Sequence, residues 1–386
     1  MALLIQHASV IDGTVGGVHE DTDVLIEDGT ITAVGESLTA PAGAEIVGAH
    51  GAPVVPGYVD IHVHGAVGKD FDGGAAAMEE IADAHAKHGT THMAMSLVTA
   101  SVEKMGRTIA ELADAAQLGH PEGARRFLGV HPEGPFLDAA HKGAHDPELL
   151  RDPTPENIDF LLQAGADKIA QVTLAPEREG GIDAIRALTD AGIVTSVGHT
   201  SCDFNTANEA FAAGATILTH TFNGMEGIHH RAPGPVIAAL RHDNVWLEVI
   251  NDGIHVHPAV VKSLFVEAPE RMVLVTDAMS ATCSPDGAYK LGELDVTVRD
   301  GVARLTEGNS LAGSTLTMDS AVARAITVEK VPADVAVAAA TSHPARAIGA
   351  ADAVGRLAAG YPADVLILDP ETYLPARILR GGRDVL

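Results

Sequence analysis

Aromatic side chains and cysteines are scarce in this 386-residue chain. Phe, Trp and Tyr make up 3% of the residues, so aliphatic side chains must build the core, and a hydrophobic fraction of 46% indicates a globular protein. The two cysteines, Cys202 and Cys283, lie outside any Cys-x-x-Cys spacing. Two isolated thiols in so long a chain argue against a disulfide framework and favour a reducing compartment, and we therefore expect a cytoplasmic protein.

Positive charge and long apolar runs are also lacking. Lys and Arg number 25 against 52 Asp and Glu, which gives a formal net charge of −27. This excess of negative charge argues against nucleic acid and anionic membranes as partners, and an anionic substrate would need a locally positive pocket. No apolar run reaches the length of about 18 residues that a membrane-spanning helix needs. The first residues also lack the basic stretch that begins a signal peptide.

Both ends of the chain are typical of β-structure. Residues 1–54 contain short apolar runs separated by turn residues, and Asp28-Gly29 between two such runs is a strong hairpin signal. The run 363–370 near the C-terminus has the same character. We predict that residues 1–54 and 345–386 pair into one small β-sandwich domain.

Between these ends, apolar strand-like runs alternate with helix-like stretches. The first run is 58–63, and seven more follow near residues 92–97, 127–130, 169–174, 194–197, 216–219, 246–249 and 272–276. Continuous apolar runs are typical of buried parallel strands, so eight such units predict a TIM-type (β/α)8 barrel over residues 55–344. A doubly wound sheet is the alternative, but polar residues at the carboxyl ends of so many strands favour the barrel, where active sites lie at that end.

A β-rich insertion interrupts the last unit at about residues 286–312. Its apolar alternation turns at Asp300-Gly301. Insertions of this size at a barrel mouth are usually functional.

The carboxyl end of the first predicted strand carries His62 and His64. Alternation along a strand points both imidazoles the same way, so that they can reach one metal ion. A lone His-x-His pair is equally compatible with two structural histidines. What favours a metal is that later apolar runs also end in ligand-type side chains.

Four of these later side chains complete a metal-dependent hydrolytic site. Glu133 follows the third run, His199 the fifth, His220 the sixth and Asp277 the eighth. One Glu and two His form a common catalytic zinc set that leaves a coordination position for water. Asp277 is then the candidate for the base that takes a proton from that water.

The order of these residues resembles the amidohydrolase superfamily of metal-dependent hydrolases. Longer motifs narrow the resemblance to the N-acetylglucosamine-6-phosphate deacetylase family, over essentially the whole chain. These motifs are Pro132–Phe136, Lys142–His145, Gly198–Thr200, His220–Met225, Asp252–His255, Thr276–Ala278 and Leu311–Ser314. The family removes acetate from the sugar phosphate and leaves glucosamine 6-phosphate.

The resemblance implies a role for each matched residue. Glu133, His199 and His220 would hold the main divalent ion, most simply Zn²⁺, and Asp277 would be the catalytic acid/base. His62 and His64, which some family members lack, would allow a second ion with Glu133 as the bridge. The phosphate would be held by Asn223, Gly224, Arg231 and His255, partly from a homodimer partner, and Ala144, His145 and Leu311 would line the sugar site.

Two other functions stay open at this stage. The first is another amidohydrolase acting on an N-acyl amino acid or a cyclic amide, but a set of Asn, Arg and His suits a phosphate better than an α-carboxylate. The second is a barrel that has kept the fold as a binding module without catalysis. Such a protein would be expected to have lost ligand residues, whereas every ligand position here is filled.

Overall fold

A ring of parallel strands forms the centre of the structure, a computed structural model that describes residues 2–118 and 126–385. The strands pair in chain order within a three-stranded and a five-stranded sheet. Isolated parallel bridges, Val130 to Ile169 and Val63 to Ala278, join the two sheets at both seams and close the ring. The strands are β6 Tyr58–Val63, β9 Thr90–Leu97, β10 Phe127–Pro132, β11 Gln171–Leu174, β12 Val194–Val197, β13 Ile217–Leu218, β14 Trp246–Ile250 and β15 Met272–Val275.

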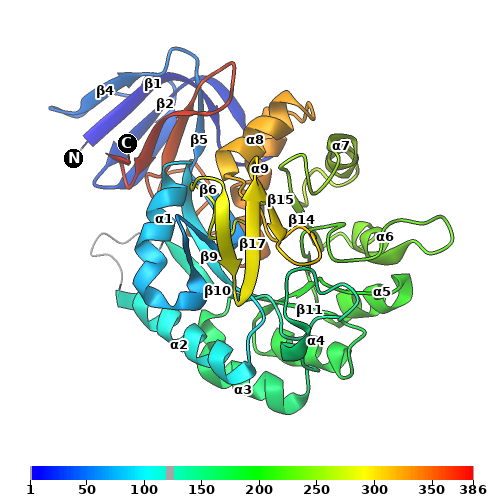
Figure 1. The fold of residues 1–386 in the computed structure, drawn as a ribbon. Helices are drawn as coiled ribbons and strands as arrows, with labels where there is room; N and C mark the ends of the chain where they lie inside the picture. The colour runs from blue at the N-terminus through cyan, green and yellow to red at the C-terminus, as the bar shows by residue number, and fades with distance from the viewer. Residues whose placement is uncertain (1, 119–125, 386) are drawn as a thin grey trace.

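Helices follow these strands and cover the outside of the ring, as a (β/α)8 barrel requires (Figure 1). Helix α5 illustrates the local causes: Asp203 caps its first turn by accepting the Thr206 N–H, and Gly214 at φ 123° ends it. No described helix is long and apolar enough to cross a membrane. The helices are α1 Met78–Ala86, α2 Val102–Leu118, α3 Pro155–Gly165, α4 Gly181–Asp190, α5 Phe204–Ala213, α6 Gly234–Leu240, α7 Pro258–Glu267, α8 Met318–Thr327, α9 Ala333–Ala339 and α10 Ser342–Ala347.

The two ends of the chain meet in one mixed eight-stranded sheet, because β5 pairs antiparallel with β19. Asp28 and Gly29, both at positive φ, form the predicted turn between β2 and β3. These pairings make one sheet, and the two-layered sandwich and the domain boundaries stay predictions. The strands are β1 Ala2–Ile11, β2 Val18–Glu27, β3 Thr30–Gly35, β4 Glu45–Gly48, β5 Pro53–Pro56, β19 Val365–Leu368, β20 Pro375–Arg380 and β21 Arg383–Asp384.

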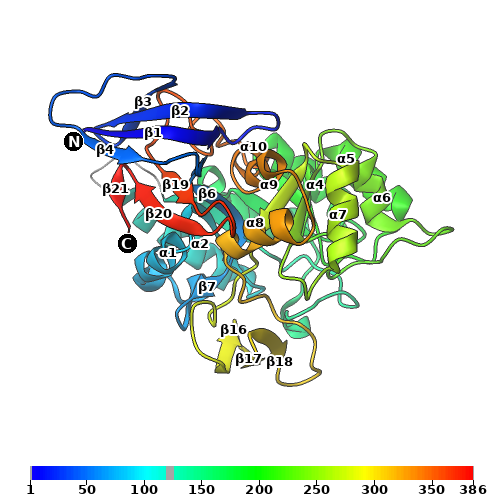
Figure 2. The same ribbon diagram turned by 90° about the horizontal axis from the view of Figure 1, so that it is seen from above.

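The insertion forms a separate three-stranded antiparallel sheet of β16 Gly287–Leu291, β17 Leu294–Arg299 and β18 Val302–Leu305. Its second turn lies at Asp300-Gly301, where the sequence predicts it. Figure 2 shows this sheet and the terminal sheet on opposite sides of the barrel. A two-stranded ribbon, β7 Gly65–Ala66 with β8 Lys69–Asp70, follows β6. The insertion therefore lies at one end of the barrel, and its residues Leu291 and Leu311 reach the pocket described next.

Candidate metal centre

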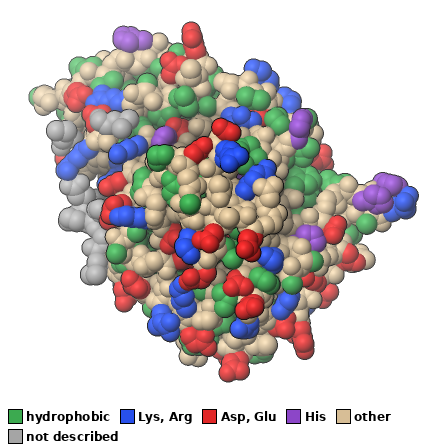
Figure 3. Space-filling view, in the orientation of Figure 1, with side chains coloured by type: hydrophobic (Ala, Val, Ile, Leu, Met, Phe, Trp, Pro, Cys, Tyr) green, Lys and Arg blue, Asp and Glu red, His purple; other side chains and the backbone are tan. Residues whose placement is uncertain are grey.

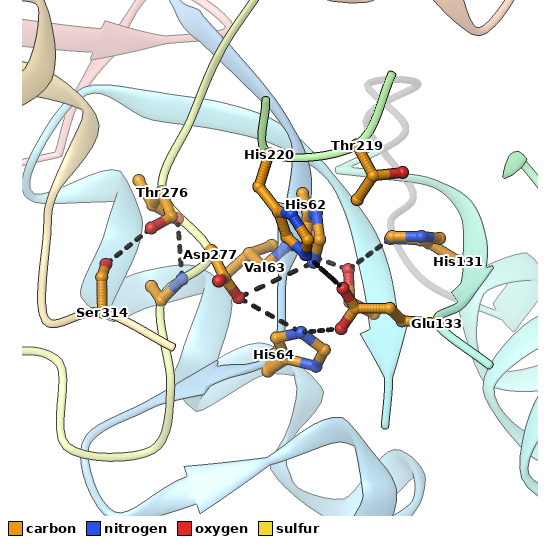
Figure 4. Close-up of polar contacts among 12 residues, drawn as sticks. His62, Val63, His64, His131, Glu133, Thr219, His220, Thr276, Asp277 and Ser314 are labelled. Atoms are coloured by element: carbon orange, nitrogen blue, oxygen red, sulfur yellow. Dashed lines mark hydrogen bonds and ion pairs between the residues drawn. The ribbon is translucent and has the colours of Figure 1, made fainter. Parts of the chain in front are cut away.

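Six buried side chains converge at the carboxyl ends of the barrel strands, and Figure 4 labels all of them except His199. The structure thus brings together every metal ligand and the base that the sequence predicts. Three of them, His199, His220 and Asp277, have φ between 25° and 49°, a region that non-glycine residues rarely adopt. Backbone strain of this kind persists only where the surroundings impose it, and it is concentrated at functional sites. The six residues are His62, His64, Glu133, His199, His220 and Asp277.

The carboxylate of Glu133 forms the centre of the first ligand group. Its Oε1 lies 3.1 Å from His199 Nε2 and 3.0 Å from His220 Nε2, and the two Nε2 atoms are 3.0 Å apart. His199 Nδ1 lies 2.8 Å from the carbonyl oxygen of His141, which can only accept. The Nδ1 proton is therefore donated to that carbonyl, and the Nε2 lone pair is free for a metal.

The second group lies on the other side of Glu133. His64 Nε2 is 3.1 Å from Glu133 Oε2 and 3.4 Å from Asp277 Oδ1. His62 Nε2 is 3.4 Å from Glu133 Oε1 and 3.6 Å from the same Asp277 oxygen. Glu133 thus contacts both groups, the geometry expected of a bridging carboxylate (Figure 4).

The donor set fits a divalent cation. His62 Nε2 is buried and has no hydrogen-bond partner, although it points at two carboxylates. An unpaired buried polar atom is costly, and a cation between these ligands would remove that cost. Imidazole and carboxylate ligands suit Zn²⁺ and several other divalent ions.

Charge within the cluster shifts the pKa of its members strongly. Burial disfavours a charged imidazole, but Glu133 and Asp277 outweigh burial and raise the pKa of His62 well above its ordinary value. The same carboxylates raise the pKa of His64 to about 9. Conversely, the neighbouring imidazoles outweigh burial and hold the pKa of Glu133 and of Asp277 below the ordinary range. In the metal-free site the two ionised carboxylates are therefore balanced by positive charge on the imidazoles, which a divalent cation would replace.

A pocket of about 220 Å³ opens beside the cluster. Six of the seven predicted substrate-binding residues line it. Five of the six converging side chains described above, all except His62, line it as well. The six substrate-binding residues are Ala144, His145, Asn223, Gly224, His255 and Leu311. His255 is oriented by Asp252, whose Oδ2 lies 2.6 Å from its Nδ1.

His145 lies closer to the metal cluster than a sugar-lining role requires. Its Nε2 is 3.5 Å from Glu133 Oε2, and its Nδ1 is 2.8 Å from the Thr99 hydroxyl. Burial lowers the pKa of His145 to about 4, so that the imidazole is neutral at pH 7. The Thr99 backbone N–H donates to His145 Nδ1 at 3.2 Å, so the ring proton is on Nε2 and can be donated to a ligand in the pocket.

Arg231, the seventh predicted substrate residue, does not line the pocket of its own chain. It lies in an exposed segment before α6, and its Nη1 is 2.6 Å from His230 Nε2. This segment projects from the body of the molecule, and histidine and basic side chains gather at its tip (Figure 3). Within one chain, Arg231 and the metal cluster are therefore separate.

The sequence did not reveal Glu248, which contacts His62, one of the six converging side chains. It is fully buried in β14, and its Oε2 lies 3.2 Å from His62 Nδ1. His131 was missed as well: its ring packs edge-on against that of His62, with centroids 4.6 Å apart. The available signal for Glu248 was a single carboxylate inside the apolar run Trp246-Leu247-Glu248-Val249-Ile250, where an unpaired charge is rarely tolerated.

Comparison with known proteins gives consistent results. A model of the amidohydrolase family matches residues 53–382. The N-acetylgalactosamine-6-phosphate deacetylase of Escherichia coli O157:H7 is 37% identical over 95% of this chain and 96% of that protein. The N-acetylglucosamine-6-phosphate deacetylase of Vibrio furnissii is 35% identical over 92% of this chain and 88% of that protein.

A solved structure is similar over the full length. It is a variant of N-acetyl-D-glucosamine-6-phosphate deacetylase from Mycobacterium smegmatis in complex with N-acetyl-D-glucosamine-6-phosphate. The TM-score is 0.92 at 37% identity, and the match covers 100% of this chain and 99% of that one.

Proposed function

Because the chain belongs to the amidohydrolase family and, within it, to the N-acetylglucosamine-6-phosphate deacetylases, we propose that it hydrolyses the acetamide of N-acetylglucosamine 6-phosphate. The products are glucosamine 6-phosphate and acetate. The observation that carries the proposal is the cluster of His199, His220 and Glu133 at the wall of a pocket lined by Asn223 and His255.

Glu133, His199 and His220 would hold the main metal ion, for which Zn²⁺ is our proposal. His62, His64 and Asp277 would hold a second ion where one binds, with Glu133 as the bridge. A divalent ion held by these residues would supply Lewis-acid chemistry, making water more acidic and the amide carbonyl more electrophilic.

Asp277 would take the proton from the attacking water and pass it to the leaving nitrogen. Its Oδ1 faces the cluster, 3.4 Å from His64 Nε2, and its depressed pKa keeps it ionised and able to accept a proton. His145, neutral and in the pocket wall, would contact the acetamide or the sugar.

The phosphate needs local donors, because the whole chain carries a net charge of −27. The Asn223 amide, the Gly224 N–H and His255 would supply part of the cradle. We propose that Arg231 of the partner subunit in a homodimer completes it, since the guanidinium fork matches a phosphate and the segment that carries it projects outward. Ile228 and Ile254, 51% and 44% exposed beside Arg231 and His255, would be covered in such a dimer.

A cytoplasmic location accords with this metabolic role and stays a prediction. The alternatives of an N-acyl-amino-acid or cyclic-amide hydrolase are not favoured, since relatives that are 37% and 35% identical over more than nine-tenths of the chain are named as amino-sugar-phosphate deacetylases. The epimer N-acetylgalactosamine 6-phosphate is a second candidate substrate, because one of the relatives is named for it.

The test is acetate release from four compounds by the purified protein with Zn²⁺: the two epimeric sugar phosphates, unphosphorylated N-acetylglucosamine and an N-acetyl amino acid. We expect turnover of N-acetylglucosamine 6-phosphate with kcat/KM at least 100-fold above that of the unphosphorylated sugar. Equal rates on the two sugars, or turnover of the amino acid alone, would reject the proposal.

A further inference from the structure

Glu248 is a carboxylate buried in the middle of β14, with an exposed fraction of 0%. It is held by three donors from three other parts of the barrel. Its Oε2 lies 3.2 Å from His62 Nδ1 and 3.2 Å from the backbone nitrogen of His220. Its Oε1 lies 3.2 Å from Gln171 Nε2. A buried charge is tolerated where it is hydrogen-bonded in this way.

These contacts fix the orientation of His62. A carboxylate accepts, so Nδ1 of His62 carries a proton, and Nε2 is the atom that faces Glu133 and Asp277 and would give its lone pair to a bound cation. Nε2 is the atom that is buried without a hydrogen-bond partner. The same Glu248 oxygen accepts the N–H of His220, whose φ of 25° is one of the unusual backbone angles of the site. One carboxylate therefore supports a member of each ligand group.

We propose that Glu248 is a positioning residue that sets the proton position of His62 and the backbone of His220, and thereby the affinity of the site for a divalent cation. The inference rests on the metal assignment made under the proposed function. Carboxylates that accept from a ligating imidazole fix its tautomer and strengthen it as a ligand, and their loss typically weakens metal binding by about 10–100-fold.

Gln171 makes the substitution Glu248→Gln informative. Gln171 Nε2 donates to Glu248 Oε1 and to the carbonyl of Ile61, 3.1 Å away. A glutamine at 248 presents one oxygen and one NH₂ group where three donors now converge. In either orientation of the new amide, its NH₂ group faces one or two of these donors and cannot accept from them. At least one of the three hydrogen bonds is therefore lost, while the shape of the side chain is kept.

The experiment compares Zn²⁺ affinity of metal-depleted wild-type protein and variants by competition with a chromophoric chelator at fixed pH. We expect Glu248→Gln to weaken Zn²⁺ binding about 10–100-fold. The matched control is Glu329→Gln, because Glu329 is also a buried carboxylate, 2% exposed, and accepts from Asn251 Nδ2 at 3.2 Å without touching the cluster. Its Zn²⁺ affinity should stay within about threefold of wild type, and thermal unfolding of the metal-free proteins reports any general loss of stability.

A double-mutant cycle separates positioning from general damage. If Glu248 acts largely through His62, then Glu248→Gln in a His62→Ala background should cost clearly less affinity than in the wild type, with the remainder due to His220. Should Glu248→Gln not fold, Glu248→Asp keeps the charge but withdraws the oxygen by one methylene, and we expect an affinity below that of wild type.

The outcomes distinguish this inference from the proposed function. A wild-type protein that takes up no Zn²⁺ would reject the proposed metal site itself. If the wild type takes up Zn²⁺ and the Zn²⁺ affinity of Glu248→Gln lies within threefold of it, only the role of Glu248 is rejected. The same holds if Glu248→Gln loses no more Zn²⁺ affinity than Glu329→Gln. The role of Glu248 would also be rejected if Glu248→Asp binds Zn²⁺ as tightly as the wild type. It would be rejected too if Glu248→Gln lowers Zn²⁺ affinity by the same factor with and without the His62 side chain.

Discussion

Replacing Asp277 with Asn isolates the proton-transfer step. The backbone of Asp277 has φ 49°, a left-handed conformation that Asn adopts more readily than most residues. Its N–H donates to the carbonyl of His62 at 2.9 Å, and its carbonyl accepts from the Ser314 N–H at 2.7 Å, and neither bond involves the side chain. Asp277→Asn therefore changes the charge and basicity of one side chain and leaves the local fold intact.

The magnitude follows from what is lost. Asn cannot accept the proton from the attacking water, and general acid–base assistance is typically worth about 10²–10⁴ in rate. At about 1.36 kcal/mol per tenfold, the barrier should rise by about 2.7–5.4 kcal/mol. The contact with His64 at 3.4 Å loses its charge, so occupancy of the second ligand group can fall, whereas Glu133, His199 and His220 do not depend on it.

The assay is kcat for acetate release from N-acetylglucosamine 6-phosphate, with metal content measured on the same preparations. Asp300→Asn is the matched control, because Asp300 also has a positive φ, of 52°, but lies in the exposed turn of the insertion. Its kcat should stay within about twofold of wild type. If Asp277→Asn keeps the metal and still turns over within a few-fold of wild type, Asp277 has no part in the proton transfer.

Three further predictions concern other residues. His199→Ala should lower both metal content, measured by elemental analysis, and turnover, and unchanged metal content would show that His199 is not a ligand. Arg231→Ala should raise KM for the phosphorylated sugar with metal content intact, and an equal loss on the unphosphorylated sugar would mark Arg231 as structural. Burial lowers the pKa of His343 to about 4, below the ordinary 6.5, so the stability it contributes is present above pH 6.5 and lost as pH falls toward 4. In His343→Asn, the slope of the free energy of unfolding against pH should fall over this window by up to about 1.4 kcal/mol per pH unit. An unchanged slope would refute this role of His343.

The barrel and the convergence of the candidate ligands at one end of it could be predicted because both depend on local patterns. Continuous apolar runs mark strands that are buried on both faces, and each run ends where its side chains reach the mouth. Glu133 and Asp277 could be placed at one edge without knowing any long-range contact, because the carboxyl ends of parallel strands meet there. The resemblance to a known family then implied a role for each residue, and these roles stay predictions.

Long-range contacts could not be predicted in the same way. Glu248 acts through donors 186, 77 and 28 residues away in the chain, and nothing in its own run of residues indicates which ones. The family resemblance implied a phosphate role for Arg231, but the sequence did not indicate that Arg231 lies in an exposed segment outside the pocket of its own chain. The sheet built from both chain ends shows a related limit. The short apolar runs predicted its strands, but their order in the sheet depends on the pairing of β1 with β2 on one side and with β4 and β5 on the other.

The most direct test of the account is acetate release from N-acetylglucosamine 6-phosphate by one preparation of the wild-type protein, measured as purified, after a chelator removes bound metal, and after Zn²⁺ is restored. The account predicts that turnover falls to the background rate on metal removal and returns with Zn²⁺, in proportion to the metal bound. Full turnover by protein verified as metal-free, or no turnover by protein with one Zn²⁺ bound per chain, would contradict it.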